Sequence, residues 1–120
     1  MGTQTTVRPL AELGQQYGQT SDNRLAVEVL IDHTALPAPT MIPRPEAVFV
    51  MVADVDDLGE WLRELGGTIH RTSAGDGLEL WTLLTKTPPS RARGQVPVRV
   101  SVPVPMGEQV MDFIRAAVAA

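Results

Sequence analysis

The sequence predicts an α+β fold in which a mainly antiparallel sheet of about five strands carries two to three helices on one face. Three observations predict this fold. Residues 96–104 place valine at every second position, which is typical of a strand with one buried face. Residues 47–53 are apolar throughout and precede a helical stripe at 55–65, which indicates a central strand followed by a helix. Gly75-Asp76-Gly77 separates two further strand-like segments and indicates a hairpin.

The first half of the chain predicts a helix, a strand and a stiff connector. A short helix is expected over 8–17, because Pro9 suits a first turn and Gly18 ends the stripe of Leu10, Leu13 and Tyr17. Alternating apolar residues over 25–31 predict a half-buried strand. Four prolines make residues 35–46 an extended connector.

The second half predicts a helix, three strands and a final helix. Asp54 is expected to cap the helix that Gly66-Gly67 ends, and strands are expected over 68–72, 78–85 and 96–104. Pro97 and Pro103 cannot donate ladder hydrogen bonds, so the last strand is expected at an edge or paired on one side only. A helix over 107–119 completes the order α-β-β-α-β-β-β-α, with inward-facing Val110, Ile114, Ala117 and Val118.

Length and composition predict one domain, residues 1–120, with residues 1–7 frayed. The absence of cysteine excludes disulfides, thiol catalysis and cysteine-based zinc sites. The formal net charge of −4 argues against a general affinity for nucleic acid. Because the chain shows neither a signal-peptide pattern nor an apolar run long enough for a membrane span, we expect a cytoplasmic protein without membrane contact.

No set of residues has the pattern of a catalytic, cofactor-binding or metal site, so none is expected. His33 and His70 are far apart in sequence, and neither has a nucleophile beside it. The acidic residues from Asp54 to Glu64 are explained by helix capping and a solvated face. The glycines at 66–67 and 75–77 follow a helix or join two strands, so they do not form a phosphate-binding loop. Enzymatic activity is therefore left open but not favoured.

The proline-rich connector is the strongest candidate for an interaction site. Met41 and Ile42 are apolar residues between Pro39 and Pro43, with Pro45 beyond, where a solvated loop is normally polar. One interpretation is that they pack against the core. The other is that they contact a second protein or a second copy of the chain, because a segment that is already extended loses less entropy on docking.

A second candidate is a basic patch. Lys86, Arg91 and Arg93 lie in one polar loop, and Arg99 lies on the neighbouring strand, with Arg71 as a further possible member. No aromatic residue interleaves with these side chains to stack bases, so nucleic-acid binding is not expected.

The segments AVFVMVA (47–53), DVDDLGEWLRELGG (54–67) and VRVSVPVPMGEQVMDFIRAAVAA (98–120) together resemble small uncharacterised actinobacterial proteins with no assigned function. Residues 47–104 also resemble one βαβββ module of the vicinal-oxygen-chelate proteins, which hold a metal through His and Glu on the sheet. The corresponding strands here carry Phe49, Met51, Val98 and Val100, which cannot bind a metal, so only the fold is implied.

The sequence thus favours a non-enzymatic interaction or regulatory module that self-associates. Two alternatives remain open. One is a small-molecule-binding or enzymatic domain with a pocket between the central strand and the helices. The other is weak nucleic-acid binding through the basic loop at 86–99.

The helical stripe yields the first prediction. Leu62 is expected in the central core, with Trp61 at the boundary between helix and sheet. Leu62→Ala should lower the free energy of unfolding by about 2–5 kcal/mol in a urea titration, as for other buried leucines. A loss below roughly 0.5 kcal/mol would place Leu62 on the surface.

Overall fold

The computed structural model describes residues 10–90 and 94–119, so the predicted fraying of residues 1–7 lies outside the described residues. The succession of element types is the predicted α-β-β-α-β-β-β-α. The elements are α1 Leu10–Thr34, β1 Thr40–Pro43, β2 Val48–Met51, α2 Val55–Leu65, β3 Thr68–Gly75, β4 Leu78–Lys86, β5 Pro97–Pro105 and α3 Asp112–Ala116.

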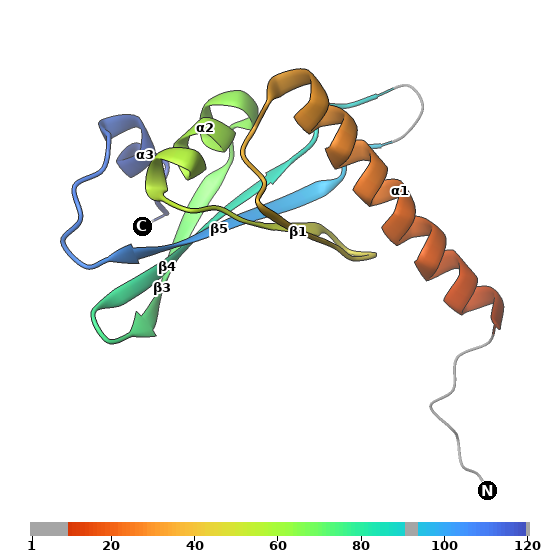
Figure 1. The fold of residues 1–120 in the computed structure, drawn as a ribbon, viewed down its shortest axis with the longest axis horizontal. Coiled ribbons are helices and arrows are strands. Elements are labelled where there is room, and N and C mark those ends of the chain that lie inside the picture. The colour runs from red at the N-terminus through yellow and green to blue at the C-terminus, as the bar shows by residue number, and fades with distance from the viewer. Residues whose placement is uncertain (1–9, 91–93, 120) are drawn as a thin grey trace, which may run out of the picture.

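The five strands form one sheet in the order β1-β2-β5-β4-β3 (Figure 1). Three neighbouring pairs are antiparallel, and β2 and β5 run parallel. The predicted α+β class with a mainly antiparallel sheet is therefore confirmed, and the single parallel pair makes the sheet mixed. The β3–β4 hairpin turns at Gly75-Asp76-Gly77, as predicted, with all three residues at positive φ.

The prediction that the valine-rich strand lies at an edge is wrong, because β5 is the central strand. The prolines of β5 fit in a central strand because β2 pairs with only part of its length. Pro97 is the first residue of β5, and β2 pairs only with residues 98–101. Beyond Ser101, β5 pairs with β4 alone, so Pro103 and Pro105 lie where the β2 side has no strand to receive a hydrogen bond. Residues 47–53, predicted as the sheet centre, contribute β2, which lies between β1 and β5.

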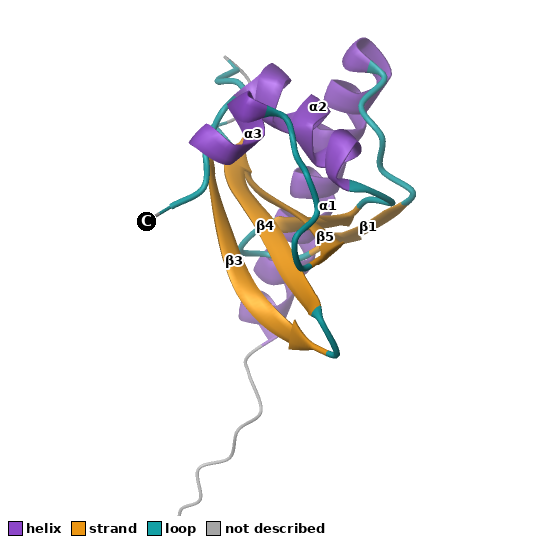
Figure 2. Ribbon diagram, turned by 90° about the vertical axis from the view of Figure 1, so that its left-hand side faces the viewer, coloured by secondary structure: helices purple, strands orange, loops and turns teal. Residues whose placement is uncertain are grey.

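The core lies between one face of the sheet and the helices. Figure 2 shows α2 and α3 on the same side of the strands. Val98, Val100, Val102 and Val104 all point to this side and are buried, beside Val48 and Val50 of β2. Leu58 and Trp61 of α2 and Ile114 of α3 close over them and are fully buried.

Helix α2 begins and ends as the sequence predicts. The Asp54 carboxylate accepts a hydrogen bond from the Asp57 N–H at 3.0 Å, and the Gly66 N–H donates to the Leu62 carbonyl at 2.7 Å. Leu62 is 8% exposed, in agreement with its predicted burial. Trp61 is fully buried, and its indole N–H donates to the Pro37 carbonyl at 2.7 Å, which ties the connector before β1 to the helix.

The predicted short helix and the predicted strand over 25–31 are one continuous helix, α1. Val27 and Leu30 are buried, while Leu25 and Val29 are about half exposed. The buried residues, Val27 and Leu30, are three positions apart, which is the spacing of a helix face. The alternation of apolar residues over 25–31 therefore does not report burial. Leu13 and Tyr17, which the sequence places on one helical stripe, are exposed in the structure, Tyr17 by 81%.

Two further elements differ from the sequence prediction. Part of the proline-rich connector forms strand β1, an edge strand paired with β2. Helix α3 has five residues, and the chain before it is irregular, although Ile114 is buried and Val110, Ala117 and Val118 pack against the core as expected. Across the described ranges, no helix combines the length and apolar character needed to cross a membrane.

The turn between α2 and β3 yields a prediction. Gly67 has a φ of +118°, and a Cβ atom there would collide with the Leu84 backbone carbonyl oxygen. Gly67→Ala should lower the free energy of unfolding by about 2–4 kcal/mol in a urea titration. The matched control is Gly14→Ala, where a Cβ meets nothing within 4 Å, and it should be neutral or stabilise the helix by up to about 1 kcal/mol. Equal effects of the two changes would contradict the turn geometry.

Candidate functional site

The helices leave one face of the sheet uncovered, and we call this the open face. Successive side chains alternate across a strand, so the register decides which residues share a face. The buried valines of β2 and β5 point toward the helices, and their neighbours Phe49, Met51, Arg99 and Ser101 point away. The register extends the same face to Ile42 of β1, to Leu80, Thr82 and Leu84 of β4, and to His70 of β3.

The open face is rich in large apolar side chains. Ile42, Met51 and Leu84 are 44%, 39% and 40% exposed. Phe49 and Leu80 are partly buried only by their neighbours in the sheet. Ile42 pairs with Phe49, Phe49 with Arg99, and Arg99 with Leu84, so these side chains form one row across four strands. The solvent-facing side of a sheet normally carries polar residues. An exposed apolar patch of this kind is typical of an interaction surface.

The charges on the open face have one sign. Arg99 lies over the Phe49 ring at 5.6 Å, and Lys86 and His70 occupy positions on the same face. Among the five strands as described, the only carboxylate belongs to Glu79, which points to the opposite face. The open face thus combines apolar area with the positive charges of Arg99 and Lys86.

The structure divides the proline-rich interaction candidates between two surfaces. Met41 is half buried and packs against the core, whereas Ile42 lies on the open face. The interpretation that the pair packs against the core thus holds for Met41, and the interaction interpretation stays a prediction for Ile42. Pro43 and Pro45 lie at the β1–β2 turn, which the amide of Asn23 holds by donating to the Arg44 and Pro45 carbonyls at 2.9 and 3.1 Å.

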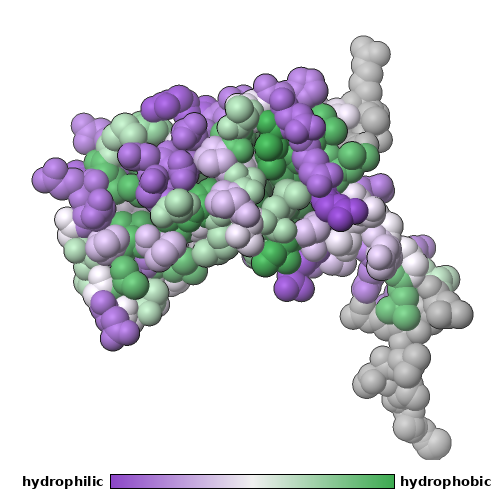
Figure 3. Space-filling model, viewed as in Figure 1, coloured by the Kyte–Doolittle hydropathy of each residue, from purple (hydrophilic) through white to green (hydrophobic). Residues whose placement is uncertain are grey.

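Residues 10–20 of α1, which we call the arm, extend past the body of the molecule. Figure 1 shows the arm, in red and orange, projecting beyond the strands and away from α2 and α3. Leu13 and Tyr17 of the arm line a groove of about 450 Å³ together with Pro43 and Pro45. Figure 3 shows apolar surface on this projecting stretch. The structure therefore brings the two prolines together with exposed residues of the arm.

Two of the four basic-patch candidates lie on the same face of the sheet. Lys86 ends β4 and Arg99 lies in β5, both on the open face, while Arg91 and Arg93 fall outside the described residues. The loop that contains them is closed at its base, because the Val96 N–H donates to the Thr87 hydroxyl at 2.9 Å. Arg71 points to the opposite face of the sheet and does not join this group.

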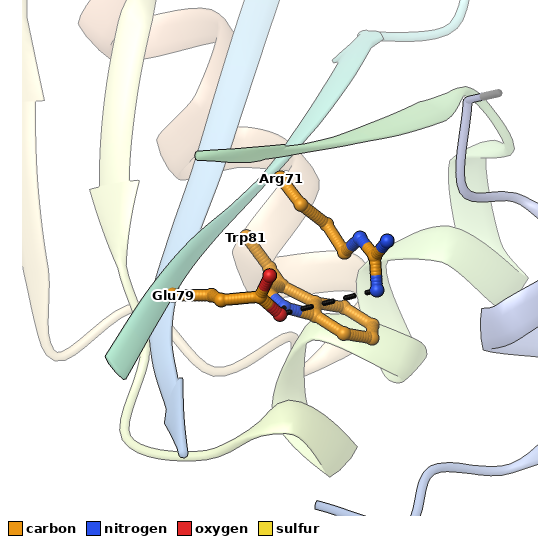
Figure 4. Close-up of polar contacts among 3 residues, drawn as sticks. All are labelled: Arg71, Glu79 and Trp81. Atoms are coloured by element: carbon orange, nitrogen blue, oxygen red, sulfur yellow. Dashed lines mark hydrogen bonds and ion pairs between the residues drawn. The ribbon is translucent and has the colours of Figure 1, made fainter. Parts of the chain in front are cut away.

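Arg71 instead lines a polar cleft beside the connection from β5 to α3. The cleft has a volume of about 570 Å³, and Glu79, Trp81, Glu108 and Arg115 also line it. Figure 4 shows the Arg71 guanidinium and the Glu79 carboxylate beside the Trp81 indole, with the guanidinium carbon 5.7 Å from the ring centre. One Glu79 oxygen accepts from the Trp81 indole N–H at 3.3 Å and lies 3.9 Å from an Arg71 nitrogen.

The histidines do not join a site with other ligands. His33 forms a hydrogen bond to the Val29 carbonyl at 2.9 Å within α1, and His70 is exposed on β3. In residues 10–90 and 94–119, no group of three or more His, Asp or Glu side chains is arranged to hold a metal ion.

Comparison with known proteins finds no matching family model, no similar curated protein and no similar solved structure. Residues 48–105 do follow the β-α-β-β-β succession that the resemblance to a vicinal-oxygen-chelate module implies. That succession concerns the fold alone.

Sequence reasoning missed the open face and the cleft for different reasons. The open face could have been found from the polar-face positions of the strands, since Phe49, Met51, Leu80 and Leu84 are large and apolar. The cleft brings residues 71–81 together with residues 107–118, and no local pattern reports that proximity.

The alternation in β1 yields a prediction. In dilute protein, Met41→Ser should lower the free energy of unfolding by about 1–3 kcal/mol, because it removes packing against the core. Ile42→Ser is the matched control and should change it by less than about 0.5 kcal/mol. Urea titration of both variants tests this, and the reverse ranking would mean that the strand register is shifted by one residue.

Proposed function

We propose that this protein is an interaction module that forms a homodimer through the open face of its sheet. The observation that carries the proposal is the row Ile42–Phe49–Arg99–Leu84, together with Met51, on a sheet face without a covering helix. Sheets in stable domains bury their apolar face against another layer. A second copy supplies that layer without any further component.

The arm supports a second copy as the occupant. An isolated helix of about 11 residues is marginal in water, and Gly14 and Gly18 weaken this one further. Tyr17 and Leu13 pack on little of their own chain. The open face is roughly 20 Å across, and a helix is about 10 Å in diameter, so an arm fits on it.

Charge also favours this pairing. The arm carries Glu12 and no basic residue, whereas the open face carries Arg99 and Lys86. If each copy lays its arm on the other's sheet, the contact is repeated by a twofold axis and closes as a dimer. Each copy then contributes both of its exposed apolar surfaces to the contact.

Binding of single-stranded nucleic acid to the open face is the second candidate, because Arg99, Lys86 and Phe49 share it. Only one aromatic residue is available there for base stacking, and the chain's net charge is −4. The protein contact is therefore favoured.

The test is the mass in solution, measured by sedimentation equilibrium from about 1 µM to about 1 mM. The wild-type chain should reach twice the monomer mass, and Ile42→Ser, Leu84→Ser and Tyr17→Ser should each shift the dissociation constant upward by about tenfold or more. Met106→Ser is the control, because Met106 is 66% exposed but lies after β5 and off the open face.

A wild-type chain that stays monomeric throughout, or a control that weakens association as much as the three variants, would contradict the proposal. Binding of a fluorescent oligonucleotide that depends on Arg99 and Lys86, without self-association, would replace it with the nucleic-acid function.

A further inference from the structure

The polar cleft lies where the core face of the sheet changes character. Toward the β2 side this face consists of valines, and Ile69 and Leu83 continue it on β3 and β4. Two residues further along, the same face carries Arg71 and Trp81, and Glu79 follows two residues beyond Trp81. The Arg71 and Glu79 side chains are 49% and 25% exposed, so solvent reaches this end of the face.

These groups line a cleft that is bordered by the chain following β5. After β5, residues 106–111 run as an irregular connection that crosses in front of the sheet before α3 begins (Figure 2). This connection contributes Glu108 and Gln109 to the cleft, and Arg115 follows from α3. The volume of about 570 Å³ lies within the range of small-molecule sites, roughly 300–1,000 Å³.

The cleft residues include two positive and two negative side chains. Arg71 and Arg115 balance Glu79 and Glu108, and the Trp81 indole lies against the Arg71 guanidinium. Arg71 is held only by the 3.9 Å contact to Glu79 and by the indole, and its side chain is 49% exposed. Its planar group presents five N–H donors, which match a carboxylate in a two-point contact.

We propose that this cleft binds a small zwitterion with the head group of a free α-amino acid. The arginines receive its carboxylate, and the glutamates receive its ammonium group. The balance of charges decides the class, because Glu79 and Glu108 would repel a phosphate or a dicarboxylate, and the arginines would repel a simple amine. The site lies on the opposite face of the sheet from the proposed dimer contact and does not depend on it.

The experiment is isothermal titration of the purified chain with each of the twenty amino acids, up to about 10 mM. At least one should bind with a stoichiometry of one per chain. The corresponding 2-hydroxy acid, which lacks the ammonium group, and the corresponding amine, which lacks the carboxylate, should each bind at least about tenfold more weakly.

Substitutions of the cleft residues test whether the ligand binds there. Arg71→Met and Glu79→Gln should each raise the dissociation constant by about tenfold or more, and Arg71→Lys, which keeps the charge but loses the planar fork, should also weaken binding. The matched control is Arg63→Met, because Arg63 also lies over an aromatic ring, 4.6 Å from the Phe113 ring centre, but does not line the cleft. This control should bind as the wild type does.

Absence of binding by any amino acid overturns the proposal, as does equal affinity for the hydroxy acid. Binding that survives both Arg71→Lys and Glu79→Gln in folded protein places the ligand elsewhere and also overturns it. Circular dichroism establishes that each variant is folded. Failure of amino-acid binding would leave the dimer proposal untouched, because the cleft and the open face lie on opposite faces of the sheet. Ile42→Ser, which alters only the open face, should leave amino-acid binding unchanged.

Discussion

The structure depends on the burial of one row of valines on β5. Val98, Val100, Val102 and Val104 are at most 2% exposed, and they lie in the central strand, where they contact both halves of the sheet and the helices above. This burial fixes the register, because a shift of one residue would turn all four valines toward the open face. It also fixes the character of the open face, since Arg99 and Ser101 must then point away from the helices.

A sheet with all its helices on one side has a consequence for function. The buried face is complete, with Leu58, Trp61 and Ile114 closing over the valines. On the opposite face, no helix of the described residues 10–90 and 94–119 lies above Ile42, Phe49 and Leu84. The same chain extends an arm with exposed Leu13 and Tyr17. These two exposed apolar surfaces belong to one molecule, and the proposed self-association rests on them.

Much of the fold could be predicted because its signals are local. The cap at Asp54, the glycines after α2 and the turn at 75–77 act within a few residues, and all were predicted. Errors arose where tertiary contacts decide. Residues 25–31 alternate like a strand, but Val27 and Leu30 pack on the sheet, so helix α1 continues through them. The prolines of β5 suggested an edge because the length of β2 is not visible in the sequence of β5.

The candidate sites divide in the same way. The sequence pointed to Met41 and Ile42, and the structure places one in the core and the other on the open face. That division follows from strand alternation in β1. The prolines at 39, 43 and 45 instead indicated a connector without strand pairing. Arg71 was grouped with the basic loop by its charge, whereas its position on β3 directs it to the opposite face. Which face a residue occupies depends on register, and register depends on contacts between distant segments.

The central claim is that the open face is covered by a second copy. The most direct measurement is a dilution series of methyl NMR spectra of the wild-type chain. The account predicts that the methyl signals of Ile42 and Leu84 shift with concentration along a single binding curve, while those of Leu83 and Val100, which are buried on the other face, do not. Signals of Ile42 and Leu84 that stay constant while the mass changes would contradict it, because association would then use another surface.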